Sequence, residues 1–404
     1  MSGGPSDILI AGAGIAGLTA ALAFAQRGFS VRLFERAPEL AEVGAGLQLS
    51  PNATRLLDSL GLAAALRQAA VRPEAIVLRR ASTSREIARV PLGAAGTRRW
   101  GADYLVIHRA DLQSVLLEAV KTHPAIRLDL GLAIEKVRQH AGGVTVSVGD
   151  GTCTSETEGR LLIGADGVWS RLRGQIGGPS CQSSGHTAWR TVIARDAPGT
   201  AALDRDMVTA FLDPRFHVVA YPLRGGRDLN LVAITRDRPG GVRAPDEWAV
   251  DGDPTALRSA MAGTGNLLRG LVDAADDWTA WPLMQVAGEA SWHTGRVVLI
   301  GDAAHAMTPH AAQGAGMAIE DAVVLAALVA AAGDGLEPDL ARFEAERRPR
   351  VERVRRRGRF NRFVWHAWGP VALGRDLVLG MRSPDKVAAD FDWLYGWKPE
   401  AWHE

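Results

Sequence analysis

The chain has 404 residues, of which 47% are hydrophobic and 23% are charged, and its formal net charge at pH 7 is +1. Because this length exceeds what one hydrophobic core usually serves, we expect two closely packed domains. The hydrophobic content excludes an intrinsically disordered chain, and the small net charge argues against a dedicated nucleic-acid-binding protein.

The N-terminal segment has the pattern of a βαβ unit: a strand over 7–11, a glycine-rich turn, a helix to Arg27 and a strand over 30–35. The crossover helix requires the two strands to be parallel. The uncharged run 8–25 is nearly long enough to span a bilayer. We favour a globular interpretation without a membrane span, because an acidic residue precedes this run and glycines interrupt it.

The turn GAGIAG fits the dinucleotide-binding pattern GxGxxG. Gly12 allows a tight turn, Gly14 lets the backbone approach a pyrophosphate, and Gly17 lets the helix pack closely on the strand. Together with Ala16, these glycines are the expected cofactor-binding residues at a helix N-terminus, where free N–H groups favour phosphate. Glu35 ends the next strand, where an acid binds ribose hydroxyls. The motif alone does not distinguish NAD from FAD.

The middle of the chain changes its pattern twice. Strands expected over 144–148 and 160–167 belong with the parallel style of the N-terminal segment. The stretches HVVAYPL and LNLVAITR, which flank RGGRD, predict an antiparallel hairpin. The run 297–302 then returns to the parallel style, and the chain beyond Gly316 is mostly helical in pattern.

We therefore predict an α/β fold with an interrupted Rossmann-like nucleotide-binding domain. Its first part covers residues 1–179, and a β-rich substrate domain is inserted over 180–290. The nucleotide-binding domain returns over 291–404, together with the C-terminal helices. The basic run 344–362 is interpreted as a solvated helix face and not as a nucleic-acid site, because glutamates interleave with its arginines.

The segment IGDAAHAMTPHAAQGAG, residues 300–316, places an acid, two histidines, a proline and glycines between a buried strand and a helix. These residues are poor choices for stability, so we predict that the segment binds a ligand. A metal site at His305 and His310 lacks a third ligand, and we expect a packing or hydrogen-bonding role for His305. Cys153 and Cys181 have no metal or redox spacing, and we expect a reducing, cytoplasmic location.

Four motifs in order, GxGxxG, HRADL at 108–112, GADG at 164–167 and GDAAH at 301–305, resemble those of the class A flavoprotein aromatic monooxygenases. This family contains salicylate hydroxylase, 3-hydroxybenzoate 6-hydroxylase and 6-hydroxynicotinate 3-monooxygenase. The resemblance covers nearly the whole chain and implies FAD as cofactor, NADH or NADPH as co-substrate and O2 as oxidant. It also implies a phenolic or hydroxylated aromatic carboxylate as substrate, hydroxylated through a flavin C4a-hydroperoxide.

The resemblance assigns roles at the adenosine end and along the cofactor. Glu35 and Arg36 would hold the adenosine, Leu130 would lie near the adenine, and Arg109 of HRADL would reach the cofactor from the following helix. Asp302 would bind the ribityl chain or the pyrophosphate linker.

Asp166 would shape the binding of FAD and of the pyridine nucleotide, although an Asp at this position also suits a helix N-cap, as Ser170 does. Gln48 would hydrogen-bond the flavin or the substrate. It stands where the 6-hydroxynicotinate branch has a histidine, which makes 6-hydroxynicotinate a less favoured substrate.

At the flavin and substrate, the residues Gly314, Ala315 and Gly316 would begin a helix whose positive end supports the reduced flavin. Pro309 would form the wall beside the ring. His217 and Tyr221 share one face of a strand and would flank the aromatic substrate, with His217 as the base that removes the ring hydroxyl's proton. Arg190 would offset the charge of flavin or substrate, or be an ordinary surface arginine.

Three alternatives stay open. A flavoprotein of the same fold could epoxidise or rearrange a larger natural product. An NAD-dependent dehydrogenase would use the glycine motif without flavin, and a non-enzymatic regulator would bind flavin without turnover. The sequence leaves open the exact substrate, the choice of NADH or NADPH, and whether the protein is a monomer or a homodimer.

Overall fold

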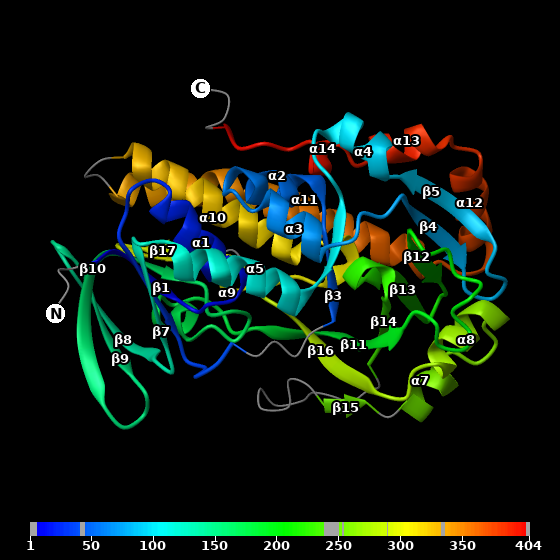
Figure 1. Ribbon diagram of the computed structural model, residues 1–404, viewed down its shortest axis with the longest axis horizontal. Coiled ribbons are helices and arrows are strands. Elements are labelled where there is room, and N and C mark those ends of the chain that lie inside the picture. Colours follow the sequence, from blue (N-terminus) through cyan, green and yellow to red (C-terminus); the bar gives the residue numbers. More distant parts are fainter. Residues whose placement is uncertain are drawn as a thin grey trace.

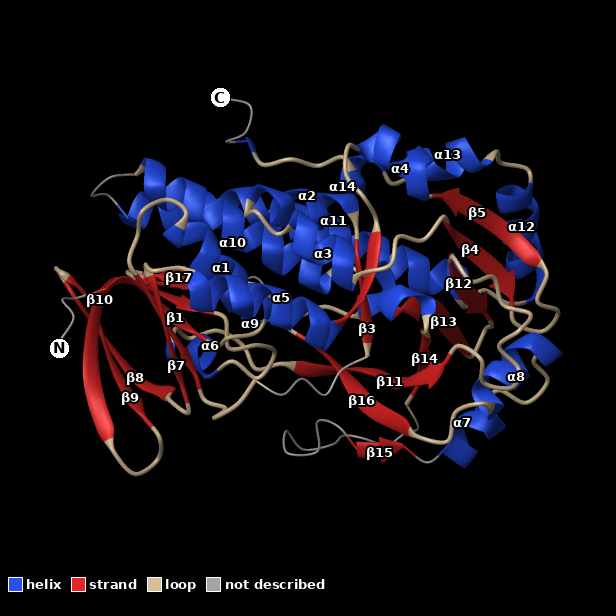
Figure 2. Ribbon diagram, in the orientation of Figure 1, coloured by secondary structure: helices blue, strands red, loops and turns tan. Residues whose placement is uncertain are grey.

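The computed structural model of the chain describes residues 6–40, 45–237, 250–252, 254–288, 290–332 and 336–400. Two large sheets stand at opposite ends of the molecule, and most helices form a layer along one side of it (Figures 1 and 2). The predicted α/β architecture with a helical C-terminal part is confirmed.

The first sheet carries the parallel strands expected of a Rossmann-like domain. Over the described residues its strands are β1 (Ser6–Ala11), β2 (Val31–Glu35), β7 (Ile126–Leu130), β8 (Ala133–His140), β9 (Gly143–Gly149), β10 (Thr154–Gly164), β17 (His293–Thr294) and β18 (Val297–Leu299). The order β7-β2-β1-β10-β18 is parallel throughout, while β8, β9 and β17 join in antiparallel fashion. The carboxyl ends of the parallel strands therefore meet at one edge, where ligands bind in such sheets.

The second sheet is mostly antiparallel. Along the sheet its strands are β15 (Val250–Gly252), β16 (Trp278–Gln285), β11 (Gln182–Ala194), β14 (Asp228–Arg236), β13 (Phe216–Leu223), β12 (Met207–Leu212), β4 (Ala75–Arg80) and β5 (Glu86–Pro91). The predicted hairpin is confirmed as β13 and β14, with His217 opposite Ile234. The sequence did not predict β4 and β5, which come from the N-terminal segment and pair with β12 in this sheet. The boundaries at 179 and 290 remain a prediction, and the second sheet extends beyond them.

A small sheet of β3 (Gly46–Leu49) and β6 (Leu105–His108) connects the two ends. The Gly46 N–H donates to Asn230 Oδ1 on β14 at 2.6 Å. A Cβ at position 46 would lie 2.6 Å from the Tyr221 ring, so only glycine lets β3 approach β13 this closely.

The described helices are α1 (Ile15–Ala25), α2 (Pro51–Ser59), α3 (Ala63–Ala69), α4 (Gly93–Trp100), α5 (Arg109–Thr122), α6 (Arg171–Gln175), α7 (Pro254–Ala260), α8 (Asn266–Asp273), α9 (Asp302–His305), α10 (Gly314–Ala331), α11 (Leu336–Trp365), α12 (Gly369–Gly380), α13 (Pro384–Ala389) and α14 (Asp392–Tyr395), with short 3-10 turns η1 (Arg224–Gly226) and η3 (Pro309–Ala311).

Two helices bear on the question of a membrane span. The apolar run 8–25 is divided between β1 and α1, so it does not form one spanning helix. Helix α10 is long and apolar enough to cross a bilayer, but 72% of it is buried inside the protein. It packs against α1, α2 and α11, as a core helix does.

Candidate active site

A cavity of about 740 Å³ lies between the carboxyl edge of the first sheet, the inner face of the second sheet and helices α11 and α12. Of the residues predicted for the site, those that line this cavity are Gly14, Ala16, Gln48, Arg109, Arg190, His217, Tyr221, Asp302, Pro309, Gly314 and Ala315. The predicted residues that lie outside its lining are Gly12, Gly17, Glu35, Arg36, Leu130, Asp166 and Gly316.

The three glycines of the first turn have three different surroundings. Gly12 has a φ of +98°, and a Cβ there would lie 2.5 Å from the Ala165 carbonyl oxygen. A Cβ at Gly17 would lie 1.8 Å from the Gly12 carbonyl oxygen, so close helix–strand packing requires glycine. A Cβ at Gly14 would meet nothing within 4 Å, because this position borders the cavity. The turn thus leaves room for a ligand where α1 begins.

Glu35 and Leu130 end neighbouring parallel strands and are paired in register. The Glu35 carboxylate accepts hydrogen bonds from the backbone N–H groups of Ala13, at 2.8 Å, and Ala37, at 3.0 Å. Glu35 therefore holds the glycine turn in place. Leu130 is 38% exposed and Arg36 is exposed. The roles of these residues toward adenosine remain predictions.

Gln48 and Arg109 reach the cavity from β3 and from the first residue of α5. The Tyr104 hydroxyl donates to Gln48 Oε1 at 2.6 Å. Burial raises the pKa of Tyr104 well above its ordinary value, so this hydroxyl keeps its proton and remains a donor. Gln48 is thereby oriented before any ligand binds.

Asp166 caps the N-terminus of α6, which is one of the two roles that its sequence position predicted. Its Oδ2 accepts from the backbone N–H groups of Arg171, at 2.9 Å, and Leu172, at 3.2 Å, at the start of α6. Ser170 Oγ accepts from the Arg173 N–H at 2.9 Å. Asp166 Oδ1 is buried and has no hydrogen-bond partner in the part of the chain that the structure describes. A ligand role for Asp166 remains a prediction beside the observed cap.

The ligand-binding segment predicted over 300–316 begins two helices at the cavity. Asp302 is exposed and opens α9, and Gly314 opens α10 with the preceding Gln313 at the cap position. A Cβ at Gly314 would meet nothing within 4 Å, so α10 begins beside open space at the cavity. Gly316 lies behind them, where a Cβ would be 3.0 Å from Gln313 Oε1.

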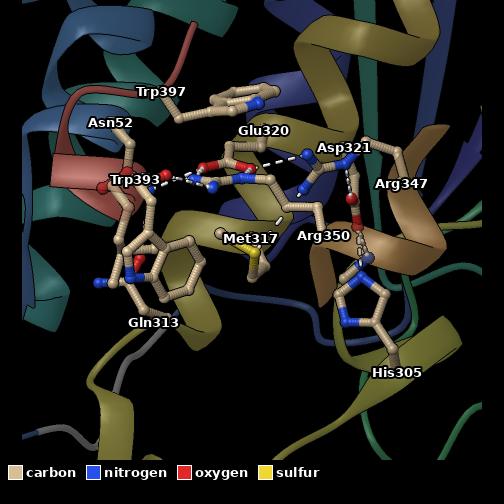
Figure 3. Close-up of polar contacts among 12 residues, drawn as sticks. Asn52, His305, Gln313, Met317, Glu320, Asp321, Arg347, Arg350, Trp393 and Trp397 are labelled. Carbon is tan, nitrogen blue, oxygen red and sulfur yellow. Dashed lines mark hydrogen bonds and ion pairs between the residues drawn. The ribbon is translucent and has the colours of Figure 1, made fainter. Parts of the chain in front are cut away.

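A buried network of charged side chains from α10 and α11 holds this segment in place (Figure 3). Asp321 accepts from the Gly301 N–H at 2.9 Å, contacts His305 Nε2 at 2.6 Å and pairs with Arg347 Nε at 2.8 Å. Burial would raise the pKa of Asp321, but His305 and Arg347 outweigh it and lower that pKa. The hydrogen bond of His305 agrees with the structural role that we expected for it.

Glu320 connects this network to Asn52 at the start of α2. It pairs with Arg347 and Arg350, each at 2.7 Å, and accepts from Asn52 Nδ2 at 2.7 Å. Asn52 in turn donates to Gln313 Oε1 at 3.1 Å, directly before α10. The two arginines overcome the effect of burial and lower the pKa of Glu320.

The solvated-face prediction for 344–362 is wrong for two of its arginines. Arg347 is fully buried, and the side chain of Arg350 is only 8% exposed. Their charges are neutralised by Glu320 and Asp321 on α10, which the local sequence of α11 does not reveal. A charged side chain can be buried in this way only when a partner of opposite charge is buried with it.

The inner face of the second sheet forms the other half of the cavity. His217, Val219 and Tyr221 line it from alternate positions of β13, as the strand period requires. Its other lining residues are apolar apart from Arg190: Ile76, Leu78, Val90, Val208, Ala210, Val232, Ile234, Trp281 and Leu283. Burial, followed by the neighbouring His310, His366 and His186, lowers the pKa of His217 well below its ordinary value. His217 is therefore a neutral imidazole.

Arg190 enters this apolar half from β11. Its Nε is buried without a hydrogen-bond partner, and no acidic side chain pairs with it among the described residues. The guanidinium lies over the Trp281 ring at 5.6 Å. Burial, and then repulsion from Arg109, lowers the pKa of Arg190. This end of the cavity is thus prepared for an anion.

Sequence reasoning missed two participants at this end. Trp365 stacks edge-on against His217 at 5.0 Å between ring centroids, and His366 Nε2 lies 3.0 Å from His217 Nδ1. His310, whose role we had left undecided, lines the cavity with both ring nitrogens buried and unpartnered among the residues described. The first two residues follow no local motif, since 149 positions separate His366 from His217.

Residues 5–358 match the family described as FAD binding domain. The chain belongs to this family. It is 35% identical over 401 residues to the 3-hydroxybenzoate 6-hydroxylase of Polaromonas naphthalenivorans (strain CJ2), with 98% of both chains covered. It is 37% identical over 392 residues to a 3-amino-4-hydroxybenzoate 2-monooxygenase of Streptomyces platensis, which covers 97% of this chain and 96% of the relative. The structure of Klebsiella pneumoniae HpxO complexed with FAD and uric acid matches with a TM-score of 0.82 at 25% identity, over 95% of each chain.

This flavoprotein is an enzyme of the aromatic monooxygenase kind, and FAD is its cofactor, as the four motifs predicted. The match argues against the NAD-dependent dehydrogenase and the non-enzymatic regulator. The described residues fit the cofactor, because Gly14 and Gly314 leave open space at two helix N-termini that face one cavity. Such termini favour the pyrophosphate and a reduced, negatively charged flavin.

Proposed function

We propose that this flavoprotein hydroxylates a phenolic aromatic carboxylate, with NADH or NADPH as electron source and O2 as the source of the inserted oxygen. The observation that carries the proposal is Arg190, a cation with a buried Nε and no acidic partner among the described residues, on the same cavity wall as the neutral base His217. A benzoate with a ring hydroxyl supplies both missing groups.

Arg190 binds the carboxylate in this proposal. In register, Val232 of β14 lies opposite both Arg190 of β11 and Val219 of β13. Strand β14 therefore lies between Arg190 and β13, which places the backbones of Arg190 and Val219 about 10 Å apart across the sheet, with His217 two residues farther along β13. A single aromatic ring fits between an anchored carboxylate and a base at that separation. A planar guanidinium also suits a carboxylate better than an ammonium does.

His217 removes the proton of the ring hydroxyl. The contact with His366 occupies its Nδ1, so Nε2 is the nitrogen available to the substrate. Loss of the proton makes the ring a better nucleophile toward an electrophilic oxygen, and a positioned base of this kind contributes on the order of 10²–10⁴-fold to the rate. Tyr221 closes the same wall as a neutral hydroxyl, because burial raises its pKa.

Bound FAD would supply the transfer of electrons to O2 and of one oxygen atom to the ring. Gly14, Asp302 and the N-terminus of α10 would hold it, with Pro309 beside the ring system. The apolar face of the second sheet excludes water from this space, which protects a reactive oxygen donor from wasteful loss as hydrogen peroxide.

The test is a screen of the FAD-loaded enzyme with 3-hydroxybenzoate, 3-amino-4-hydroxybenzoate, salicylate and unsubstituted phenol. We expect a hydroxybenzoate to stimulate NADH or NADPH oxidation and to yield a hydroxylated product. In His217→Ala, product formation should fall on the order of 10²-fold, while flavin absorbance is retained. A parental enzyme that hydroxylates none of the carboxylates, or a His217→Ala variant with parental turnover, contradicts the proposal.

A further inference from the structure

Four histidines from four different elements meet at the substrate end of the cavity. They are His186 of β11, His217 of β13, His310 of η3 and His366, which follows α11. His310 is central, with ring centroids 5.4 Å from His217, 5.8 Å from His186 and 6.2 Å from His366. Over the described ranges, no group of three or more His, Cys, Asp or Glu residues is arranged to hold a metal ion. The cluster requires another explanation.

Among the described residues, one pair in this cluster is directly hydrogen-bonded. His217 Nδ1 and His366 Nε2 are 3.0 Å apart. Two neutral imidazoles make this bond only when one nitrogen carries a proton and the other presents a lone pair. His217 is 1% exposed and lines the cavity, whereas His366 is partly exposed and lies outside the cavity lining. The pair therefore leads from the cavity wall toward solvent.

We propose that His217 and His366 form a proton-transfer dyad, in which His366 accepts the Nδ1 proton of His217 and delivers the substrate's proton to solvent. This inference rests on the proposed function, because it takes His217 as the base. It adds His366, a residue that does not line the cavity, as the positioning and relay group.

The surroundings explain why one histidine does not suffice. Burial lowers the pKa of His217 well below 6.5. Burial, followed by His186, Arg236 and Arg362, lowers the pKa of His366 to about 4. A proton taken from the substrate at neutral pH therefore rests on neither ring and must move on. The charged groups that act on the cluster from neighbouring elements are Arg236, Arg362, Asp213 and Asp237.

The steps conserve protons. The substrate O–H bond breaks and an N–H bond forms at His217 Nε2. The N–H bond at His217 Nδ1 then breaks as one forms at His366 Nε2, and His366 releases the proton of its Nδ1 to water. The dyad resets when a proton returns along the same path to the product hydroxyl. The resting state must therefore have His217 protonated on Nδ1, since the opposite tautomer would present an N–H donor, and no base, to the substrate.

Two variants separate relay from support. In His366→Gln the side-chain amide oxygen still accepts from His217 Nδ1 but takes up no proton, and His366→Ala removes both functions. His140→Gln is the control, because this exposed histidine of β8 in the first sheet belongs neither to the cluster nor to the cavity lining. Retained flavin absorbance and thermal unfolding temperature establish that each variant is folded.

The holoenzyme is mixed in weak buffer with the hydroxybenzoate that it hydroxylates, and a pH-indicator dye reports proton release. We expect His366→Gln and His366→Ala to release protons and to turn over at least about tenfold more slowly, with substrate affinity nearly unchanged. Added imidazole should restore part of the rate only in His366→Ala. His140→Gln should match the parent. Parental rates in both His366 variants would overturn the dyad.

A second measurement needs no substrate. Nitrogen NMR of the holoenzyme labelled at histidine reports which ring nitrogen of His217 carries the proton, with His217→Ala providing the assignment. We expect the Nδ1–H tautomer, and the Nε2–H tautomer would refute the dyad. If no hydroxybenzoate is hydroxylated by the parent, the proposed function fails, and the tautomer still decides whether His366 orients His217.

Discussion

The two ends of the cavity differ in whether their buried polar groups have hydrogen-bond or ion-pair partners. At the cofactor end, Arg347 is fully buried, yet Glu320 and Asp321 neutralise it, and Asn52 and Gln313 complete the hydrogen bonds (Figure 3). At the substrate end, Arg190 has a buried Nε with no partner among the described residues, and His310 has two such nitrogens.

The difference separates stability from binding. A buried charge whose partners are all present fixes the structure around it, and removing one partner strongly destabilises the fold. A buried polar group without partners costs free energy in the empty protein, and a ligand recovers that free energy by supplying the missing group. The cofactor end is therefore preorganised, and we expect the substrate to supply the missing partners at the substrate end.

The largest expected effect follows from breaking the paired end. Arg347→Met leaves Glu320 and Asp321 buried with too little compensating charge, and we expect it to lower the free energy of unfolding by about 3–5 kcal/mol. Denaturant unfolding measures this change. Arg138→Met is the control, because Arg138 and its partner Glu156 are 66% and 64% exposed in their side chains and such a pair contributes little. Equal losses in both variants would contradict the comparison.

An intermediate effect is expected at the unpaired end. Arg190→Met should leave the free energy of unfolding unchanged or increased, because it removes a partly buried charge that has no acidic partner among the described residues. It should weaken the binding of a hydroxybenzoate by about 1.5–3 kcal/mol, the size of a hydrogen bond to a charged group. Flavin-fluorescence titration measures the affinity, and phenol, which lacks the carboxylate, should bind parent and variant alike. A variant that loses affinity for phenol but not for the hydroxybenzoate would contradict the role of Arg190 in binding the carboxylate.

A smaller effect is expected from pH. Above pH 6.5 the histidines of the cluster are neutral in both the folded and the unfolded protein. Below pH 6.5 they take up protons in the unfolded chain, whereas in the folded protein the pKa is only about 4 for His366 and about 3 for His310. The free energy of unfolding should therefore fall between pH 6.5 and 5, before Glu320 and Asp321 titrate, since their pKa values are lowered.

His310→Asn should make this decline with pH shallower, as one titrating group fewer is buried. Denaturant titrations at several pH values between 8 and 5 measure the slope. His140→Asn is the control, because it makes the same substitution at an exposed histidine outside the cluster. An unchanged slope in His310→Asn would show that the cluster does not couple protonation to folding.

Local signals in the sequence predicted what is built locally. The GAGIAG turn, the Gly314 helix start and the β13–β14 hairpin each depend on residues within a few positions of one another, and each has the predicted form. Alternation along β13 also predicted that His217 and Tyr221 share a face, and both line the cavity.

Contacts between distant segments were beyond the same signals. Nothing near Arg347 indicates that α10 supplies its two carboxylates, and nothing near His217 indicates that His366 contacts it. The strand β4 has the pattern of any short β-strand, and its membership of the second sheet depends on pairing with β12. Such partners are chosen by tertiary packing, which residue patterns do not encode one segment at a time.

The parallel pairing of Ala75–Arg80 with Met207–Leu212 has a consequence for how the chain is made. During synthesis on the ribosome, β4 emerges long before its neighbour exists, and the first sheet likewise waits for Val297–Leu299. Both sheets are thus finished late, and the exposed edges of their early strands must be shielded until then. We therefore expect the yield of folded protein in cells to depend on chaperone supply as well as on final stability.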